Sequence, residues 1–547
     1  MNGLTNGLTA LDWLVIGLYF ILLMGIAWWV IRQKQEDSED YFLAGRNVGW
    51  FIVGASIFAS NIGSEHLVGL AGAGADSGMP LAHYELHAWI VLVLGWVFLP
   101  FYARSGVFTM PEFLEKRYNA KARRFLSVVS LVGYIFTKVS VSIYAGGVVF
   151  QSFLGIGFWP GAILTLVITG LYTILGGMRA VVYTEALQTI VLITGALSVT
   201  LIGLNHEAVG GWFGLKEIVG SEHFNMWKPI DHPRYPWTGM VFGGAIVGIW
   251  YWCTDQYIVQ RVLSAKNITE GRRGAIWGGF LKILPVFLFL VPGMVAYALS
   301  QKGVLQYESA NEVLPAMVKT LLPSGIRGLV AAGLLAALMS SLASVFNSAS
   351  TLFTIDIYKK LKPQTPEKDL VRTGRIATGI IVLLGFAWIP VMKNAPGTLY
   401  DYLQSVQSYI APPITAVFLL GIFFKRINAK GAMATLIGGF AIGLVRLTLD
   451  TFKTFNPGVS YTGFWKTVQD IPFSHFAIVM FVICVGILIV VSLLTAKPSE
   501  KQLAGLTFGT LSPEQINSNK NSYNKWDVIA SLGIVAIIVG ILMYFTG

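Results

Sequence analysis

Long apolar runs separated by short polar gaps repeat along the whole chain of 547 residues. Each run is close to the roughly 20 residues that an α-helix needs to cross a bilayer. The pattern therefore predicts an all-α polytopic membrane protein with about 14 transmembrane helices. The predicted spans are 11–31, 48–72, 81–103, 124–153, 157–177, 180–204, 238–262, 274–299, 328–358, 372–393, 399–424, 431–449, 473–495 and 526–545.

The second predicted span contains a stretch, Gly54–Gly72, that is unsuited to a continuous membrane helix. It reads GASIFASNIGSEHLVGLAG and includes four glycines, three serines and the charged residue Glu65. Each unsatisfied backbone group in hydrocarbon costs several kcal/mol, so such a segment should line a protein cavity or water. We expect the helix to break near Ala59–Ser64 and its freed carbonyls to bind a ligand.

Composition agrees with a membrane protein and adds a topology. Hydrophobic residues make up 54% of the chain and charged residues 12%, which is too little charge for a soluble protein of this length. The net charge of +11 comes from Lys and Arg that concentrate in alternate gaps, among them 104–124, 261–273 and 359–375. This alternation indicates membrane topology and argues against nucleic-acid binding. The positive-inside rule places these gaps in the cytoplasm and both termini outside a cell membrane.

Ionisable and amide side chains inside the predicted spans are candidates for function, because burying them in a membrane is costly. Five of them come from separate parts of the chain: Asn61, His66, Glu85, Lys282 and Gln404. They offer donors and acceptors of several kinds but lack the Arg cluster that a carboxylate or phosphate would need. We interpret them as a shared cavity for a neutral, hydroxyl-rich solute. For Lys138 and Asp255, a helix-to-helix contact is an equally good explanation.

The aromatic run Trp250–Trp252 lies near the middle of the predicted span 238–262. Aromatic rings offer apolar faces with polar edges, which suits the C–H faces of a sugar ring. An interfacial aromatic belt is the alternative, but the depth of this run favours the cavity. The glycines that precede it, Gly243, Gly244 and Gly248, predict a second interrupted helix. Two interrupted helices five spans apart are typical of inverted five-helix repeats with a site near the bilayer midplane.

Hydroxyl side chains follow one helical stripe in Ala337–Thr351, which reads ALMSSLASVFNSAST. Ser340 and Ser344 are four residues apart, and Ser341 and Ser344 are three apart, so they share a face of the helix. Small polar stripes often serve only as packing faces between membrane helices. A hard monovalent cation, however, needs several neutral oxygens, which hydroxyls together with free carbonyls at a helix break can supply.

At these residues the sequence resembles the sodium/glucose cotransporter group of the solute:sodium symporter family. The resemblance covers most of the chain and is carried by the segments 54–72, 250–267 (WYWCTDQYIVQRVLSAKN), 278–285 (GGFLKILP), 337–358 and 401–423 (DYLQSVQSYIAPPITAVFLLGIF). It implies a LeuT-like core of two inverted five-helix repeats within a single transporter domain, 1–547. The repeats would be 48–204 and 238–424, and the peripheral helices would be 11–31, 431–449, 473–495 and 526–545.

The resemblance also assigns site residues. It implies a sugar site formed by Asn61, His66, Glu85, Lys282 and Gln404, with Tyr251 as inner gate and Trp252 beside it. The implied outer gate is Leu70, Tyr84 and Tyr400. The implied sodium ligands are the carbonyls of Ala59, Ile62 and Ala337 and the hydroxyls of Ser340 and Ser341.

A second sodium site is a separate question. Relatives with two sodium sites carry an Asp where this chain has Glu185, and they often have Ser where it has Ala337. Glu185 with Ser341 and Ser344 could still form a second site, so the sequence leaves one and two sodium ions per cycle both open.

The sequence thus predicts a transporter, not an enzyme, that uses a Na⁺ gradient to carry a neutral hexose of the glucose or galactose type into the cell by alternating access. Its predicted partners are the sugar, sodium and the lipid bilayer, without nucleic acid. The alternatives are sodium- or proton-coupled transport of another polyol such as myo-inositol, and a sugar-gated channel or sensor with the same fold. A membrane glycosyl transferase is disfavoured because no clustered acid/base or metal motif stands at a membrane face.

Overall fold

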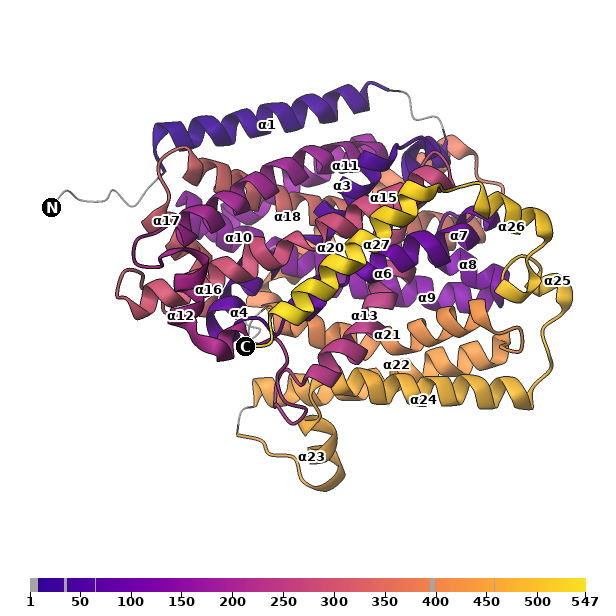
Figure 1. Ribbon diagram of the computed structural model, residues 1–547. Helices are drawn as coiled ribbons and strands as arrows, with labels where there is room; N and C mark the ends of the chain where they lie inside the picture. The colour runs from indigo at the N-terminus through magenta and orange to yellow at the C-terminus, as the bar shows by residue number, and fades with distance from the viewer. Residues whose placement is uncertain (1–7, 34–36, 64, 394–398, 457) are drawn as a thin grey trace.

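The computed structural model describes residues 8–33, 37–63, 65–393, 399–456 and 458–547. These residues form an elongated helical bundle in which most helices run between its two ends (Figure 1). Ten stretches of the described chain are helical, long and apolar enough to cross a membrane. They are α1 (Ala10–Ile31), α5–α7 (Ala82–Ser105), α11 (Phe158–Leu204), α15–α16 (Ile268–Gln301), α18–α19 (Ile326–Leu361), α20 (Glu367–Lys393), α21 (Leu399–Phe423), α22 (Ala429–Phe455), α24 (Phe473–Leu494) and α27 (Lys525–Tyr544).

The predicted number of 14 spans stays a prediction. α11 covers two predicted spans, because Gly177 adopts φ 54° and ψ −153° and turns the chain inside it. Two other predicted spans are interrupted helices, each piece of which is too short to cross a bilayer. One is α3–α4 (Trp50–Asn61 and Ala71–Ser77), and the other consists of Gly239–Thr254, which contains α13 (Gly244–Gly248), and α14 (Gln256–Leu263). A third predicted span, α9–α10 (Ala120–Gly133 and Ser140–Leu154), is one helix joined by the π-helical segment η4 (Tyr134–Val139).

Short helices connect these spans. They are α2 (Ser38–Leu43), α8 (Met110–Arg117), α12 (Gly211–Phe224), α17 (Val313–Leu321), α23 (Gly463–Asp470), α25 (Glu500–Leu503) and α26 (Pro513–Lys520).

The first interrupted helix breaks within the predicted stretch. α3 ends at Asn61, and Ile62 has extended backbone with φ −81° and ψ 105°. The chain becomes helical again in the π-helical segment η2 (Glu65–Leu70), which leads into α4. The break at Ile62 leaves the last carbonyls of α3 without partners in their own helix, as at any helix end.

The second predicted interrupted helix is also broken, and the break lies at Asp255, after the aromatic run. The π-helical segment η5 (Gly239–Gly243), α13 and the π-helical segment η6 (Ile249–Thr254) follow one another up to Asp255, which has ψ 127° and is the N-cap of α14. The glycines serve close packing: a Cβ on Gly243 would lie 2.1 Å from the carbonyl oxygen of Ser474. The hydroxyl of Tyr257 in α14 donates to the carbonyl of Ser60, which joins the two interrupted helices.

Two neighbours hold α3 in place. It crosses α15 at small residues, where a Cβ on Gly54 would lie 2.7 Å from the carbonyl oxygen of Gly274. Such close backbone approach is how membrane helices associate when lipid supplies no hydrophobic contrast. α18 (Ile326–Thr351) is buried along most of its length and packs against both α11 and α3. It therefore carries the serine stripe to the break in α3.

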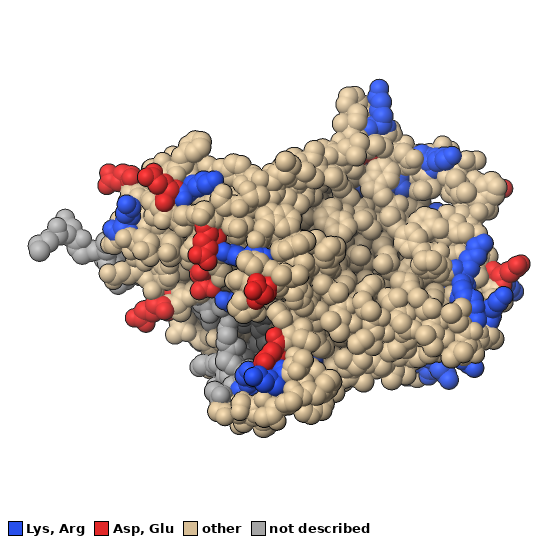
Figure 2. Space-filling view, turned by 60° about the horizontal axis from the view of Figure 1, so that its bottom comes forward, with Lys and Arg blue, Asp and Glu red and all other residues tan. Residues whose placement is uncertain are grey.

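Charge is distributed unevenly between the two ends of the bundle. Figure 2 shows Lys and Arg gathered at the end that carries α8, α25 and α26 in Figure 1, Asp and Glu more prominent at the opposite end, and a band with few charges between them. α1 begins and α27 ends toward the acidic end (Figure 1). This arrangement agrees with the positive-inside rule for a protein whose basic end is cytoplasmic. The orientation of the termini itself stays a prediction.

Candidate functional site

A cavity lies beside the break in α3 and brings together side chains from spans that are far apart in sequence. Its lining residues are Asn61, His66, Tyr84, Glu85, His87, Val247, Gly248, Tyr251, Trp252, Lys282, Leu403, Gln404 and Gln407. All seven residues predicted for the sugar site are among them. The structure therefore places these residues at one site, and their individual roles in binding stay predictions.

Charge in the cavity is balanced within the protein. The ammonium group of Lys282 donates to Oε2 of Glu85, and both side chains are almost fully buried. Oε1 of the same carboxylate lies 3.5 Å from Nε2 of His66. Because Nδ1 of His66 accepts from the backbone N–H of Gly63 at 3.4 Å, the ring proton belongs on Nε2, where it faces Glu85. The pairing of one carboxylate with one ammonium makes the site suitable for an uncharged solute.

Two amide oxygens in the cavity have no protein partner among the described residues. They are Oδ1 of Asn61 and Oε1 of Gln404, and both atoms are buried. The amide nitrogen of Asn61 donates to the hydroxyl of Tyr251 at 3.2 Å. A buried polar atom without a partner costs about 1–3 kcal/mol, so these two oxygens are positioned for groups that a ligand or water brings.

Aromatic rings cover one side of the cavity. Tyr251 and Trp252 pack edge to face with ring centroids 5.0 Å apart. Nζ of Lys282 lies 5.6 Å from the centroid of Trp252, within the range of a cation–π contact. Two residues of the aromatic run, Tyr251 and Trp252, thus line the cavity and present apolar ring surface beside its polar groups, while Trp250 lines a neighbouring cavity.

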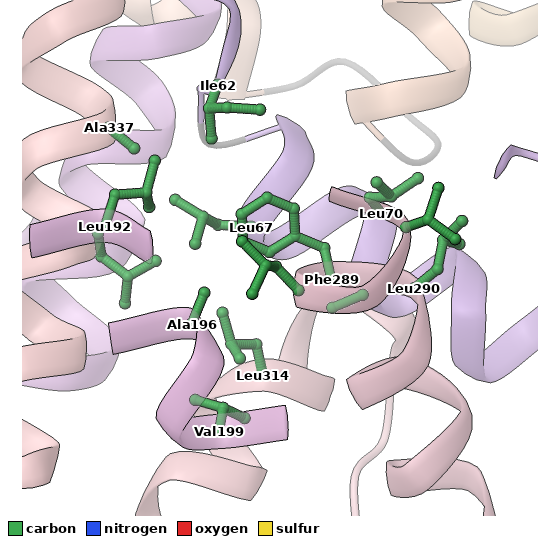
Figure 3. Close-up of a cluster of buried hydrophobic side chains, with 14 of the residues drawn as sticks. Ile62, Leu67, Leu70, Leu192, Ala196, Val199, Phe289, Leu290, Leu314 and Ala337 are labelled. Atoms are coloured by element: carbon green, nitrogen blue, oxygen red, sulfur yellow. The ribbon is translucent and has the colours of Figure 1, made fainter. Parts of the chain in front are cut away.

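The three predicted outer-gate residues have different positions. Tyr84 lines the cavity. Leu70 does not: it is fully buried in a hydrophobic cluster with Leu67, Phe289 and Leu290, beyond the break at Ile62 (Figure 3). The side chain of Tyr400 lies outside the described residues, as does that of Glu65.

The predicted sodium ligands lie together where α18 meets the break. Oγ of Ser340 donates to the carbonyl of Ala59 at 2.8 Å and to that of Ala337 at 2.9 Å. Oγ of Ser341 lies 3.3 Å from the carbonyl oxygen of Ile62. Neutral carbonyl and hydroxyl oxygens are hard ligands, the kind that replace the hydration shell of a monovalent cation. The residues present therefore fit a sodium ion, while each ligand's assignment stays a prediction.

The predicted second sodium site has a different character. Oε1 of Glu185 lies 3.2 Å from Nη2 of Arg261, and both side chains are fully buried. The hydroxyls of Ser56 and Ser344 also donate to this carboxylate, and Arg261 donates to Ser344. A fixed guanidinium thus stands where a second cation would bind. The sequence counted Arg261 only as a charge of a cytoplasmic gap, whereas the structure buries its side chain in α14.

Sequence reasoning missed two features of this region. His87 and Gln407 line the cavity but were not among the predicted site residues, although Gln407 lies in the quoted segment 401–423. Lys138 and Asp255, left unassigned, form an ion pair of 2.8 Å. The hydroxyl of Tyr134 also donates to Asp255, and Nζ of Lys138 lies 3.8 Å from the ring centroid of Tyr257.

A second, mainly apolar cavity begins at this ion pair. Its lining includes Tyr134, Lys138 and Trp250, and it shares Leu403 and Gln407 with the first cavity. The two cavities are therefore neighbours, with the ion pair and the aromatic run between the polar site and the apolar space.

Comparison with known proteins identifies the family. The model of the sodium:solute symporter family matches residues 41–439. The chain is 41% identical to sodium/glucose cotransporter 1 of Oryctolagus cuniculus over 525 residues, covering 89% of this chain and 79% of the relative. It is 40% identical to sodium/myo-inositol cotransporter 2 of Homo sapiens over 540 residues, covering 92% of this chain and 80% of that protein.

Solved structures identify the fold. A Na⁺-coupled sialic acid symporter in a substrate-bound outward-open state superposes with a TM-score of 0.76, at 21% identity, over 90% of this chain and 99% of that one. A nucleobase-cation-symport-1 family transporter in a closed conformation gives a TM-score of 0.51 at 12% identity, over 90% of this chain and 100% of that one. The architecture is thus the LeuT-like fold. With the family model matching most of the chain and relatives near 40% identity, the chain belongs to the sodium:solute symporter family, whose members are transporters driven by sodium and not enzymes.

Proposed function

We propose that this symporter carries a neutral hexose of the glucose or galactose type into the cell together with sodium. One observation carries the proposal: the cavity combines two unpartnered amide oxygens, on Asn61 and Gln404, with a carboxylate and an ammonium that neutralise each other. A hydroxyl both donates and accepts, so a polyhydroxylated ring can satisfy all of these groups at once. The rings of Tyr251 and Trp252 supply a surface for its C–H faces.

Coupling follows from the break in α3. Asn61 lines the cavity, and its neighbours Ala59 and Ile62 present carbonyls to Ser340 and Ser341. A sodium ion held there fixes the backbone that positions Asn61, so sodium raises sugar affinity. By linkage, bound sugar raises sodium affinity by the same factor.

The number of sodium ions carried per cycle sets the free energy that is available for sugar accumulation. One sodium ion that enters down an inside-negative membrane potential of about 100 mV contributes about 2.3 kcal/mol. A tenfold sodium gradient adds about 1.4 kcal/mol. Together these sustain a sugar accumulation of roughly a few hundredfold. Because Arg261 already neutralises Glu185, we propose that one sodium, bound at Ser340 and Ser341, drives each cycle.

Uptake into proteoliposomes tests the function. Labelled glucose, galactose and myo-inositol are offered at fixed pH with an inward sodium gradient, and in parallel with potassium replacing sodium. We expect glucose or galactose to accumulate above equilibrium only with sodium. Unchanged hexose uptake without sodium contradicts the proposal, and equilibration without accumulation favours a channel or sensor. Sodium-driven accumulation of myo-inositol alone, which the human relative at 40% identity makes the second candidate, assigns the site to a polyol.

The ion site has its own test. Ser341→Ala removes the hydroxyl oxygen 3.3 Å from the carbonyl of Ile62. We expect uptake to be abolished, or to lose its dependence on sodium. A sodium activation curve that coincides with that of the wild type would place the ion elsewhere.

A further inference from the structure

His87 lies at a kink in the third predicted span. Leu86 and His87 separate α5 (Ala82–Glu85) from α6 (Ala88–Val93), and ψ is 10° and 7° at these two residues, in place of the value near −42° of a regular helix. Residues two apart on a regular helix point about 200° away from each other. Because the kink interrupts the regular helix, Glu85 and His87 can point to the same side, and both line the cavity.

The facing helix leaves room for the imidazole. A Cβ on Gly248 would lie 3.0 Å from Nδ1 of His87, and a Cβ on Gly244 would lie 3.3 Å from Nε2. The ring therefore rests against the bare backbone of α13 at two glycines one turn apart. The ring of Tyr84 packs against its other side, with centroids 5.4 Å apart. These contacts fix the ring without using either nitrogen.

Neither ring nitrogen of His87 has a hydrogen-bond partner among the described residues. His83, which lies in α5 four residues earlier, provides the contrast. Both histidines are 6% exposed, but Nε2 of His83 bonds to the carbonyl of Met226 at 3.1 Å, and His83 does not line the cavity. The ring nitrogens of His87 are not among the fully enclosed polar atoms, and the residue lines the cavity, so a ligand there can supply the missing hydrogen bond.

We propose that His87 is a specificity-determining residue that hydrogen-bonds a hydroxyl of the bound sugar. A neutral imidazole offers one donor and one acceptor, whereas Glu85 only accepts and Lys282 only donates. His87 thus adds a contact whose strength depends on where one particular hydroxyl lies on the sugar ring. The inference rests on the proposed function, because it requires a polyhydroxylated solute in this cavity.

Deoxy sugars identify such a contact. Binding of glucose, galactose and their monodeoxy analogues is measured on the purified full-length protein in saturating sodium. We expect one analogue to bind the wild type roughly 3- to 10-fold more weakly than its parent through loss of this bond. In His87→Phe, which keeps a ring of similar size, this discrimination should disappear at that position, while discrimination at the other positions remains.

Two further variants separate specificity from folding. His83→Phe removes the neighbouring buried histidine and should keep the wild-type deoxy pattern. If His87→Phe does not fold, Gly244→Ala displaces the imidazole by a methyl group and should weaken the same position. A deoxy pattern in His87→Phe or Gly244→Ala identical to that of the wild type overturns the role of His87 while leaving the symport intact. Failure of the wild type to bind any of these hexoses with sodium instead removes the proposed function.

Discussion

Two buried carboxylates, Glu85 and Glu185, are each paired with a cation, but the two ion pairs have opposite surroundings. Glu85 and its partner Lys282 line the cavity and share it with polar groups that have no protein partner. Glu185 and its partner Arg261 are enclosed by hydroxyls of the protein and line none of the cavities described above. The groups of the first pair can form hydrogen bonds to a solute in the cavity, whereas the groups of the second pair have all of their described partners within the protein.

The difference separates two uses of buried charge. Removing one partner of a buried ion pair leaves the other charge uncompensated, and the cost depends on whether water can reach it. At the cavity, water can replace the lost partner, so the main effect should fall on solute binding. At the enclosed pair, the main effect of removing one partner should be a loss of folding stability.

The largest effect is expected from Arg261→Met. This change leaves Glu185 buried without its cation, and we expect it to lower the free energy of unfolding by about 3–5 kcal/mol. Thermal unfolding of the purified protein in detergent measures the loss. The double variant Arg261→Met/Glu185→Gln should recover much of it, since no charge then remains. Equal stability of Arg261→Met and the wild type would mean that the pair is not enclosed.

Lys282→Met tests the ion pair that lines the cavity. It removes a charge-assisted bond to Glu85, worth about 1.5–3 kcal/mol, and exposes an unbalanced carboxylate to the solute. Sugar affinity should fall roughly 10- to 100-fold, while the thermal unfolding temperature falls much less than in Arg261→Met. A variant that unfolds as readily as Arg261→Met would show that the two pairs are equivalent.

Gln404→Ala has a smaller expected effect. It removes an amide oxygen that has no protein partner, and with it one neutral bond to the solute. We expect sugar affinity to fall roughly 3- to 10-fold, with the sodium activation curve at saturating sugar nearly unchanged. Ser408→Ala is the matched control: its hydroxyl bonds to the backbone carbonyl of Gln404 and does not line the cavity. A loss of sugar affinity in the control would indicate a disturbed helix.

The smallest expected effect concerns the number of ions. If the enclosed pair holds no sodium, the Hill coefficient for sodium is close to 1 in the wild type. Ser344→Ala, which removes a hydroxyl that donates to Glu185, should leave it unchanged. A wild-type coefficient near 2 that falls in Ser344→Ala would instead assign a second sodium to Glu185.

Several features followed from sequence because they depend on local chemistry. The break in α3 could be placed at Ala59–Ser64 because glycines and polar residues interrupt an apolar run at membrane depth. The cavity residues could be grouped because a polar side chain inside a span needs a reason to be there. Both inferences use the residue and its depth, and neither requires the packing of helices.

What the sequence did not reveal depends on backbone geometry and packing. His87 faces the cavity only because ψ at Leu86 departs from helical values, and no turn residue marks that kink. In the sequence Arg261 resembles a cytoplasmic loop charge. Its burial becomes visible only in the structure, where α14 (Gln256–Leu263) carries its side chain into the bundle. Lys138 and Asp255 become partners through the fold, 117 positions apart.

The carbonyl of Ser60 is shared between the ion site and the second interrupted helix. The hydroxyl of Ser341 lies 3.5 Å from it, and the hydroxyl of Tyr257 donates to it from beside Lys138. A change at Ser341 that moves this carbonyl therefore also alters the bond that holds α14. Affinity and turnover are then subject to a trade-off: a variant selected for growth at low sodium should transport more slowly when sodium is abundant.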